Sequence, residues 1–278
     1  MKIGFHVSIK GGVDKTVERA EELGCDTFQM FTRNPRMWKA RELEEFEINK
    51  FKEKLRGSSI SPVFSHMPYL SNLASPQEEV YQKSCDALRE EVRRCILLEV
   101  PYIVTHLGSH LGSGKEEGAK NISNALNQIH EEFESSPMML LENTSGKSHD
   151  MGSTFQELKE IIDKVDSKLG VCFDTCHAFA RGYDLRTCKD LDNVINTFDK
   201  TIGIENLHLI HLNDSKGELD SRLDRHQHIG FGAIGEEGFR NILDSKLAEK
   251  PMIMETPIDD TRGDEENMSK VLELANHV

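Results

Sequence analysis

The chain has 278 residues, a formal net charge of −14 at pH 7 and a sequence pI near 5.3. This length suffices for one large domain, and the negative charge argues against binding nucleic acid unless positive charge is concentrated locally. No apolar run is long enough to cross a bilayer, and the chain opens with a strand-like segment in place of a signal peptide. We therefore expect one domain over residues 1–278, a monomer, and a cytoplasmic location. The six cysteines include no C-x-x-C pair, which favours reduced core thiols.

Short β-rich runs alternate with amphipathic segments along the whole chain. We expect strands at residues 2–7, 27–32, 62–67, 102–107, 138–143, 170–174, 207–212 and 252–256. Apolar residues that recur every three or four positions predict helices at 14–23, 43–55, 78–98, 115–133, 154–165, 185–202, 236–243 and 265–275. This strict alternation is typical of an α/β protein built as a (β/α)₈ TIM barrel, and a doubly wound sheet is the alternative.

From the third to the eighth, every predicted strand ends in a side chain that can bind a metal ion. These side chains are His66, His106, Glu142, Asp174, His211 and Glu255. On a barrel the carboxyl ends of the strands converge on one face, where active sites of this fold are built. Ser, Thr or Asn would cap a following helix better than His does, so helix capping explains the set poorly. The set predicts a metal site at this rim.

Three more candidate ligands lie outside the strands. His177 follows Asp174 by three residues, and Asp224 and His226 lie on one side of an extended segment. His228 could compete with His226. His6, at the end of the first strand, is a candidate for supporting a ligand. The weaker candidates are His208, which should face the helices, and His110, His130, His149 and His277, which fall in loops or on polar helix faces.

Five imidazoles and four carboxylates are too many ligands for one ion. Nitrogen and oxygen ligands without thiolate suit Zn²⁺, Mn²⁺ or Fe²⁺, and the imidazole content favours zinc. Two adjacent metal ions can stabilise both the attacking and the leaving oxygen of a displacement at phosphorus. Phosphoester hydrolysis is therefore the first reaction class to consider.

The motifs around these residues resemble those of endonuclease IV, the zinc-dependent apurinic/apyrimidinic endonuclease family. They are SHMPYL (65–70), THLGSH (105–110), LENTSG (141–146), FDTCHAFA (173–180), HLNDSK (211–216), DRHQHIGFGAIG (224–235) and METP (254–257). The resemblance covers essentially the whole chain. It departs at Leu107, where relatives usually carry Pro, and at Arg181, where a small residue is usual. Both positions lie outside the candidate ligands.

The resemblance implies a TIM barrel with three zinc ions, for which Mn²⁺ or Fe²⁺ could substitute. Its substrate would be double-stranded DNA, cut 5′ to an abasic site to leave a 3′-OH and a 5′-deoxyribose phosphate, and blocked 3′ ends would also be cleaned. One zinc would be held by His66, His106 and Glu142, a second by Glu142, Asp174, His211 and Glu255, and a third by His177, Asp224 and His226. Glu142 would be catalytic because it bridges two ions. Three dications would also offset the ligand carboxylates and leave the rim attractive to phosphate.

The loop after the second strand contains Arg33, Arg36 and Trp38, the only tryptophan. Arginines beside an aromatic residue suit a loop that contacts a duplex, and by resemblance Arg36, Tyr69 and Leu70 would enter the base stack. The alternative is a solvated loop whose tryptophan packs on the barrel.

A second class of enzyme remains open. Sugar isomerases and epimerases of the xylose isomerase-like group share the barrel and a metal-binding rim. An isomerase needs only one or two metal ions, so the three ligands outside the strands discriminate against it. A noncatalytic metal-binding or DNA-binding module is disfavoured because the ligands converge at the catalytic face of the fold.

Overall fold

The structure is a computed structural model that describes residues 1–133 and 135–276, so the weaker candidate His277 lies outside the described residues. Within these residues, eight parallel strands form a closed barrel in the order β1-β10-β7-β6-β5-β4-β3-β2. The strands are β1 (Lys2–Val7), β2 (Phe28–Met30), β3 (Val63–His66), β4 (Tyr102–Thr105), β5 (Met138–Glu142), β6 (Gly170–Asp174), β7 (Leu207–His211) and β10 (Pro251–Met254). The predicted (β/α)₈ barrel is confirmed.

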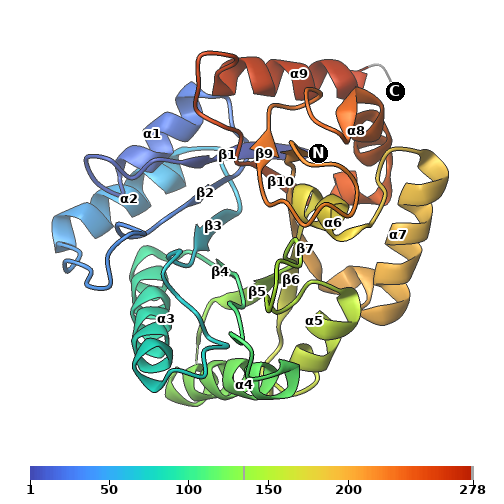
Figure 1. Cartoon of the computed structure of the whole chain (residues 1–278). Coiled ribbons are helices and arrows are strands. Elements are labelled where there is room, and N and C mark those ends of the chain that lie inside the picture. The colour runs from blue at the N-terminus through green and yellow to red at the C-terminus, as the bar shows by residue number, and fades with distance from the viewer. Residues whose placement is uncertain (134, 277–278) are drawn as a thin grey trace.

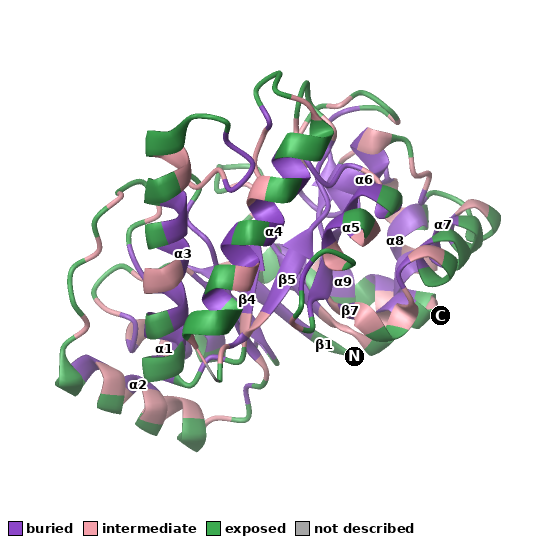
Figure 2. Ribbon diagram, turned by 90° about the horizontal axis from the view of Figure 1, so that it is seen from below, coloured by how far each residue is buried: buried purple, intermediate pink, exposed green. Residues whose placement is uncertain are grey.

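An outer ring of helices surrounds the strands (Figure 1). These helices are α1 (Lys15–Glu22), α2 (Glu45–Gly57), α3 (Glu78–Leu98), α4 (Lys115–Glu132), α5 (Phe155–Ile162), α7 (Cys188–Thr201), α8 (Gly235–Asp244) and α9 (Asp264–Asn276). Every predicted strand and helix occurs, with ends within three residues of the prediction. In Figure 2 the outer helices, α3 and α4 most clearly, are buried on the side toward the strands and exposed on the outer side. This two-faced burial matches the helical periodicity from which they were predicted. No helix among the described residues is long and apolar enough to span a membrane.

A short helix and a small hairpin were not predicted. Helix α6 (Thr175–Arg181) lies inside the ring of outer helices (Figure 1) and begins where the Asp174 carboxylate accepts a hydrogen bond from the His177 N–H at 2.7 Å. Strands β8 (Asp214–Ser215) and β9 (His226–Gln227) pair antiparallel, and two 3₁₀ turns cover Ile204–Asn206 and Lys246–Glu249. Both α6 and β9 carry candidate ligands to the rim.

Two layers of side chains fill the barrel interior. The lower layer is apolar and fully buried, and it consists of Phe64, Val104, Leu140, Cys172, Leu209 and Ile253. Each of these residues precedes one of the six strand-end candidate ligands by two positions. Because side chains in a strand alternate between faces, the ligand two residues later also points into the barrel, one layer higher.

The alternation of side chains predicted that His208 faces the outer helices, and this prediction is wrong. A register shift between β6 and β7 pairs Val171 with Leu207 and Cys172 with Leu209, so His208 is the extra residue. Its ring lies 5.8 Å from the Tyr102 ring, and a Cβ on Gly170 would meet its Cδ2 atom. A bulge reorients a single side chain in this way, and here it places His208 at the floor of the barrel.

The cysteines are free thiols, as predicted. Five of them are buried and Cys188 is exposed. Burial raises the pKa of the Cys25 and Cys172 thiols to about 12. These thiols therefore stay protonated near neutral pH and are poor metal ligands.

Candidate metal centre

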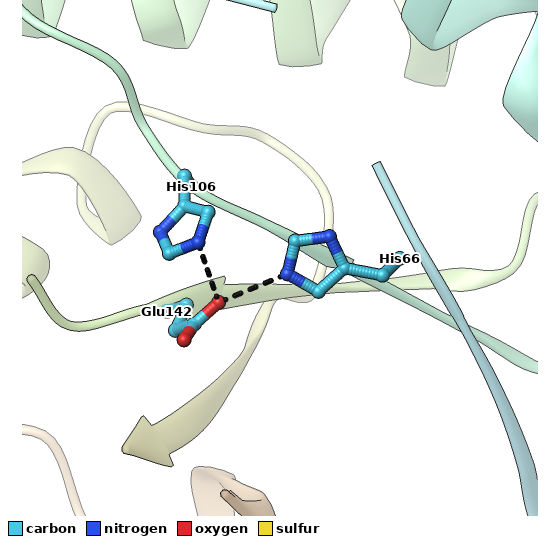
Figure 3. Close-up of side chains that lie close together, drawn as sticks. All are labelled: His66, His106 and Glu142. Atoms are coloured by element: carbon cyan, nitrogen blue, oxygen red, sulfur yellow. Dashed lines mark hydrogen bonds and ion pairs between the residues drawn. The ribbon is translucent and has the colours of Figure 1, made fainter. Parts of the chain in front are cut away.

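Glu142, at the end of β5, is the centre of the first group of ligand atoms. Its Oε2 atom lies 3.2 Å from Nε2 of His66 and 3.4 Å from Nε2 of His106, so that both rings point at one oxygen (Figure 3). The three ligand atoms of this group lie within 4.8 Å of one another. Glu142 and His66 are buried, whereas 36% of the His106 side chain is exposed. The group is therefore open to solvent on the His106 side.

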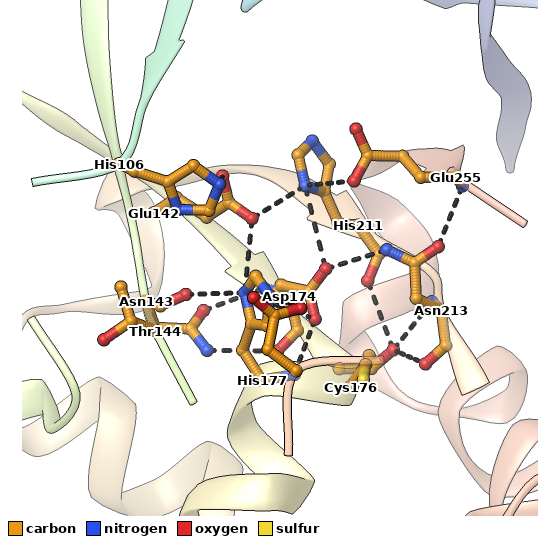
Figure 4. Close-up of polar contacts among 12 residues, drawn as sticks. His106, Glu142, Asn143, Thr144, Asp174, Cys176, His177, His211, Asn213 and Glu255 are labelled. Carbon is orange, nitrogen blue, oxygen red and sulfur yellow. Dashed lines mark hydrogen bonds and ion pairs between the residues drawn. The ribbon is translucent and has the colours of Figure 1, made fainter. Parts of the chain in front are cut away.

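A second group shares Glu142. Its ligand atoms come from Glu142, Asp174, His211 and Glu255 and again lie within 4.8 Å of one another. Nδ1 of His211 is 3.1 Å from Oε1 of Glu142 and 3.4 Å from Oε2 of Glu255. Glu142 therefore presents one oxygen to each group, which is the arrangement that a bridging carboxylate needs (Figure 4).

The third group differs in one member from the set implied by resemblance. His177 and His226 come together with Asp174 within 4.8 Å, and Asp224 lies at the edge. Oδ1 of Asp224 is 3.2 Å from Nε2 of His177, while Oδ2 is 3.3 Å from the Lys147 ammonium. Asp224 thus faces the group, but it is partly held by a lysine that a cation could displace.

Main-chain carbonyls fix the protonation of three candidate histidines. Nδ1 of His66 lies 2.7 Å from the Met67 carbonyl, Nδ1 of His177 lies 2.9 Å from that of Asn143, and Nδ1 of His226 lies 3.0 Å from that of Glu255. A carbonyl can only accept, so Nδ1 carries a proton in each ring and Nε2 is the nitrogen that faces the site, where a metal ion could bind it. Nε2 of His226 is buried and has no hydrogen-bond partner among the described residues. These are the features of metal-binding histidines, and the residues fit metal ions.

Buried charges of opposite sign also shape the site. Burial alone would raise the pKa of Glu142, but the imidazoles around it, His106 and His211 first, hold that pKa well below its ordinary value. Burial would lower the pKa of His177, but the nearby carboxylates, Asp174 first, raise it well above the ordinary value. Burial would likewise lower the pKa of His211, but Cys172 and then the carboxylates of Glu255 and Glu142 raise it well above the ordinary value. The carboxylates therefore stay ionised and the protein supplies a compensating positive charge, which bound cations could provide in place of protons.

Gln29 supports the second group and was missed by the sequence analysis. Its Oε1 atom lies 2.9 Å from Nε2 of His211, which leaves Nδ1 of that ring for the site. Its Nε2 amide donates to Oε1 of Glu255 at 2.9 Å and lies 2.9 Å from Nδ1 of His6. His6 in turn lies 3.1 Å from Glu255, in keeping with its expected supporting place. Its position between the apolar residues Phe28 and Met30 of a predicted strand is the sequence feature that could have identified it.

Two asparagines next to candidate ligands were missed as well. Asn213 donates to Oδ2 of Asp174 at 2.7 Å and accepts from the N–H of Glu255 at 2.8 Å (Figure 4). Asn143 accepts from the N–H of Asp174 at 2.7 Å. Each follows a strand end, in the sequences Glu-Asn and His-Leu-Asn. Together they fix the positions of two carboxylates through contacts among the ends of four strands, β5, β6, β7 and β10.

His228 does not compete with His226. It is fully buried, with Nε2 at 3.0 Å from Asp259 and Nδ1 at 3.1 Å from the Asn267 amide. The segment that follows His228 is held by the buried Asp214 of β8, whose carboxylate accepts hydrogen bonds from the N–H groups of residues 215, 230, 232 and 234. The hairpin that carries His226 is thereby fixed without help from a metal ion.

A cavity of about 580 Å³ opens above the ligand groups, and its walls include Tyr69, Ser145, Asp150 and most of the candidate ligands. At its rim, 63% of Tyr69 and 37% of Leu70 are exposed, and Arg36 is exposed on the neighbouring loop. Large apolar side chains exposed beside a cavity of this kind are typical of a contact surface for another molecule.

Arg33 and Trp38 are not part of that surface. Arg33 is only 5% exposed and donates to the carbonyls of Trp38 and Ala87, so the prediction that it faces a duplex is wrong. Trp38 is partly buried against the main core, as the alternative interpretation of this loop predicted. A charged loop residue can be buried when its N–H donors bind main-chain carbonyls of the loop. Sequence periodicity does not reveal such contacts.

Comparison of the chain with known proteins identifies its family. A family model described as "Xylose isomerase-like TIM barrel" matches residues 17–276. The probable endonuclease 4 of Methanoculleus marisnigri is 50% identical, over 98% of this chain and 98% of that protein, and the probable endonuclease 4 of Nitrosopumilus maritimus is 49% identical, over 99% and 100%. The chain belongs to the endonuclease IV family. The resemblance predicted from the motifs is confirmed.

Solved structures agree with this placement. The crystal structure of endonuclease IV from Thermus thermophilus is 37% identical, covers 100% of this chain and 98% of its own, and superposes with a TM-score of 0.86. A D-tagatose 3-epimerase-like protein superposes with a TM-score of 0.71 at 22% identity, which indicates a common fold alone. The isomerase alternative therefore has less support than the endonuclease.

Proposed function

We propose that this protein is a DNA repair hydrolase that cuts the phosphodiester 5′ to an abasic site. The products would be a 3′-OH and a 5′-deoxyribose phosphate, and the same site would remove blocking groups from 3′ ends. The observation that carries the proposal is the convergence of nine nitrogen and oxygen ligand residues on the rim of a barrel whose family is endonuclease IV. We expect the whole chain to act as one domain and as a cytoplasmic monomer.

Three zinc ions would occupy the site. His66, His106 and Glu142 would hold the first, and Glu142, Asp174, His211 and Glu255 the second. His177, His226 and Asp224 would hold the third, with Asp174 close enough to contribute. When bound, such ions supply a nucleophile near neutral pH and stabilise the charge that develops on the oxygens at phosphorus.

The protein's own residues prepare this chemistry. Glu142 keeps its negative charge because imidazoles surround it, so it can contribute to two ions without first losing a proton. Main-chain carbonyls orient the rings of His66, His177 and His226, and this orientation exists before the substrate arrives. A preformed site of this kind avoids the cost of reorganisation during the reaction.

The exposed side chains at the rim would select the damaged nucleotide. An abasic nucleotide has lost its stacking and pairing, so it costs less to extrude than an intact one. Arg36, Tyr69 and Leu70 are exposed beside the cavity, where they could fill the gap in the duplex. Selection would then reside in the loops, and hydrolysis in the ligand groups below them.

Metal analysis together with two substrates tests the proposal. Purified protein should contain about three zinc ions per chain and should incise a duplex that carries one abasic site. The double variant Arg36→Ala, Tyr69→Ala should lose most duplex incision while keeping its zinc and its hydrolysis of bis(p-nitrophenyl) phosphate. A single metal ion per chain and no incision would favour an isomerase. A parallel fall on both substrates would mean that the rim residues support the ligand groups and do not contact DNA.

A further inference from the structure

Three charged side chains are buried behind the β2–α2 loop, which we define as residues 31–44. Arg33 is the third residue of this loop, and Glu91 and Arg94 lie on α3. Their side chains are 3%, 0% and 4% exposed. Charged groups are rarely buried to this extent unless they are paired and hydrogen-bonded, because leaving water costs them free energy. Their contacts therefore show which parts of the structure these buried side chains hold in place.

Glu91 connects α3 to the ends of two barrel strands. Its Oε1 atom accepts hydrogen bonds from the Thr32 hydroxyl at 2.8 Å and from the Ser65 hydroxyl. Its Oε2 atom lies 3.6 Å from Nε of Arg33. Ser65 is the neighbour of the candidate ligand His66 on β3, so this carboxylate ties the loop to the strand that carries a ligand.

Both arginines donate hydrogen bonds to main-chain carbonyls of the loop. Arg94 donates to the carbonyls of Thr32 at 2.6 Å and Arg41 at 2.8 Å, and Arg33 donates to that of Trp38 at 3.1 Å. The loop contains no helix or strand, so its carbonyls need partners from elsewhere. A planar guanidinium can hold two separated carbonyls at once, which a lysine ammonium on a flexible stem cannot do equally well.

The loop that is held in this way connects the cavity rim to an exposed tip. At its start, the Phe31 ring lies 5.1 Å from the Tyr69 ring and 5.7 Å from the His66 ring. At its tip, Arg36 and Met37 are exposed. Connections of this length without secondary structure are uncommon and are usually functional. The buried charges therefore fix a segment that leads from the ligand groups to the solvent.

We propose that Glu91, Arg33 and Arg94 are positioning residues that hold the β2–α2 loop in a preformed shape for contact with duplex DNA. The inference rests on the proposed function and adds residues that contact neither DNA nor the ligand groups' metal ions. A loop that is already ordered does not lose conformational entropy when the duplex binds, so the buried charges increase affinity for the duplex. A substrate too small to reach the loop gains nothing from them.

The variant Arg94→Lys tests the inference. It keeps a positive charge near Glu91 but cannot span the carbonyls of Thr32 and Arg41. The matched control is Arg93→Lys, one residue earlier on α3, where the arginine is exposed and pairs with Glu132 at 3.0 Å. For Arg94→Lys we expect KM for an abasic duplex to rise about tenfold with kcat within about twofold. Hydrolysis of bis(p-nitrophenyl) phosphate and zinc content should be unchanged, and amides of residues 31–44 should exchange hydrogen faster. The control should match the parent throughout.

Two results would overturn the inference. One is faster amide exchange in the loop with an unchanged KM for the duplex, and the other is a parallel loss on both substrates. If Arg94→Lys does not fold, Glu91→Gln, which preserves size, is measured in the same way against the same criteria. A parent protein that hydrolyses the small diester but leaves the abasic duplex intact would instead contradict the proposed function.

Discussion

The two layers inside the barrel are built from the same strands but meet opposite physical requirements. Leu140 and Glu142 on β5, or Leu209 and His211 on β7, are separated by only two residues and are all fully buried. The lower layer gains free energy by leaving water, whereas the upper layer loses it and is compensated by hydrogen bonds and opposite charges. The difference indicates that stability of the fold resides in the lower layer and chemistry in the upper one.

The upper layer also depends more than the lower one on side chains outside it. Its carboxylates and imidazoles crowd within a few ångströms of one another and depend on partners such as Gln29 and Asn213. Removing one member of a buried charged group leaves the others without compensation. Substitutions in the two layers should therefore have different signatures, and three experiments compare them.

The largest effect is expected for Glu142→Ala. Glu142 belongs to two ligand groups, so its loss should disturb two metal ions, and we expect incision of an abasic duplex to fall by more than about 10³-fold. His226→Ala should cost less, because His226 belongs to one group. Single-turnover incision at matched zinc loading measures both. Equal losses, or a larger loss for His226→Ala, would contradict the bridging role of Glu142.

An intermediate effect of another kind is expected for Leu140→Ala in the lower layer. Removing a fully buried leucine side chain should lower the free energy of unfolding by about 2–5 kcal/mol. The ligand groups lie one layer above, so kcat of the protein that remains folded should stay within about twofold. Urea unfolding followed by far-UV circular dichroism, with incision assays at low temperature, separates the two quantities. A loss of zinc without a loss of stability would show that the layers are not separable.

The smallest effect is expected for Gln29→Ala. Without the amide, the ring of His211 loses the acceptor that fixes its orientation, and Glu255 loses a donor. Loss of such supporting contacts typically weakens metal affinity by about 10–100-fold. Competition with a chromophoric chelator measures this affinity without reference to activity. Gln29→Glu should not restore it, since a carboxylate beside Glu255 would add like charge. Unchanged affinity in Gln29→Ala would show that the ring is held by other contacts.

The sequence predicted the barrel and the convergence of the strand-end side chains because both follow from simple periodicities. Residues two positions apart in a strand share a face, so an apolar residue followed by a strand-end histidine or carboxylate is sufficient to place both layers. The convergence of distant strand ends then follows from the fold. Glu142 and His211 could therefore be placed together from their positions in the chain alone.

The features that sequence analysis missed depend on local geometry that has no period. The bulge that turns His208 inward arises from the pairing of β6 with β7, and the burial of Arg33 depends on carbonyls of its own loop. The choice between Asp174 and Asp224 near His177 is a matter of a few ångströms in a long connection. Gln29 was detectable in principle, as a polar residue within an apolar strand.

The upper layer also contains contacts between the first two barrel strands and the residue that follows the last one. His6 of β1 and Gln29 of β2 meet Glu255, which follows β10, across 249 and 226 residues of sequence. A chain emerging from the ribosome produces β10 after all the other barrel strands, and contacts of such separation form only once the intervening chain has been ordered. Nascent or broken chains that lack this strand therefore cannot complete the ligand set. On the proposed function, hydrolysis would therefore begin only after folding is finished.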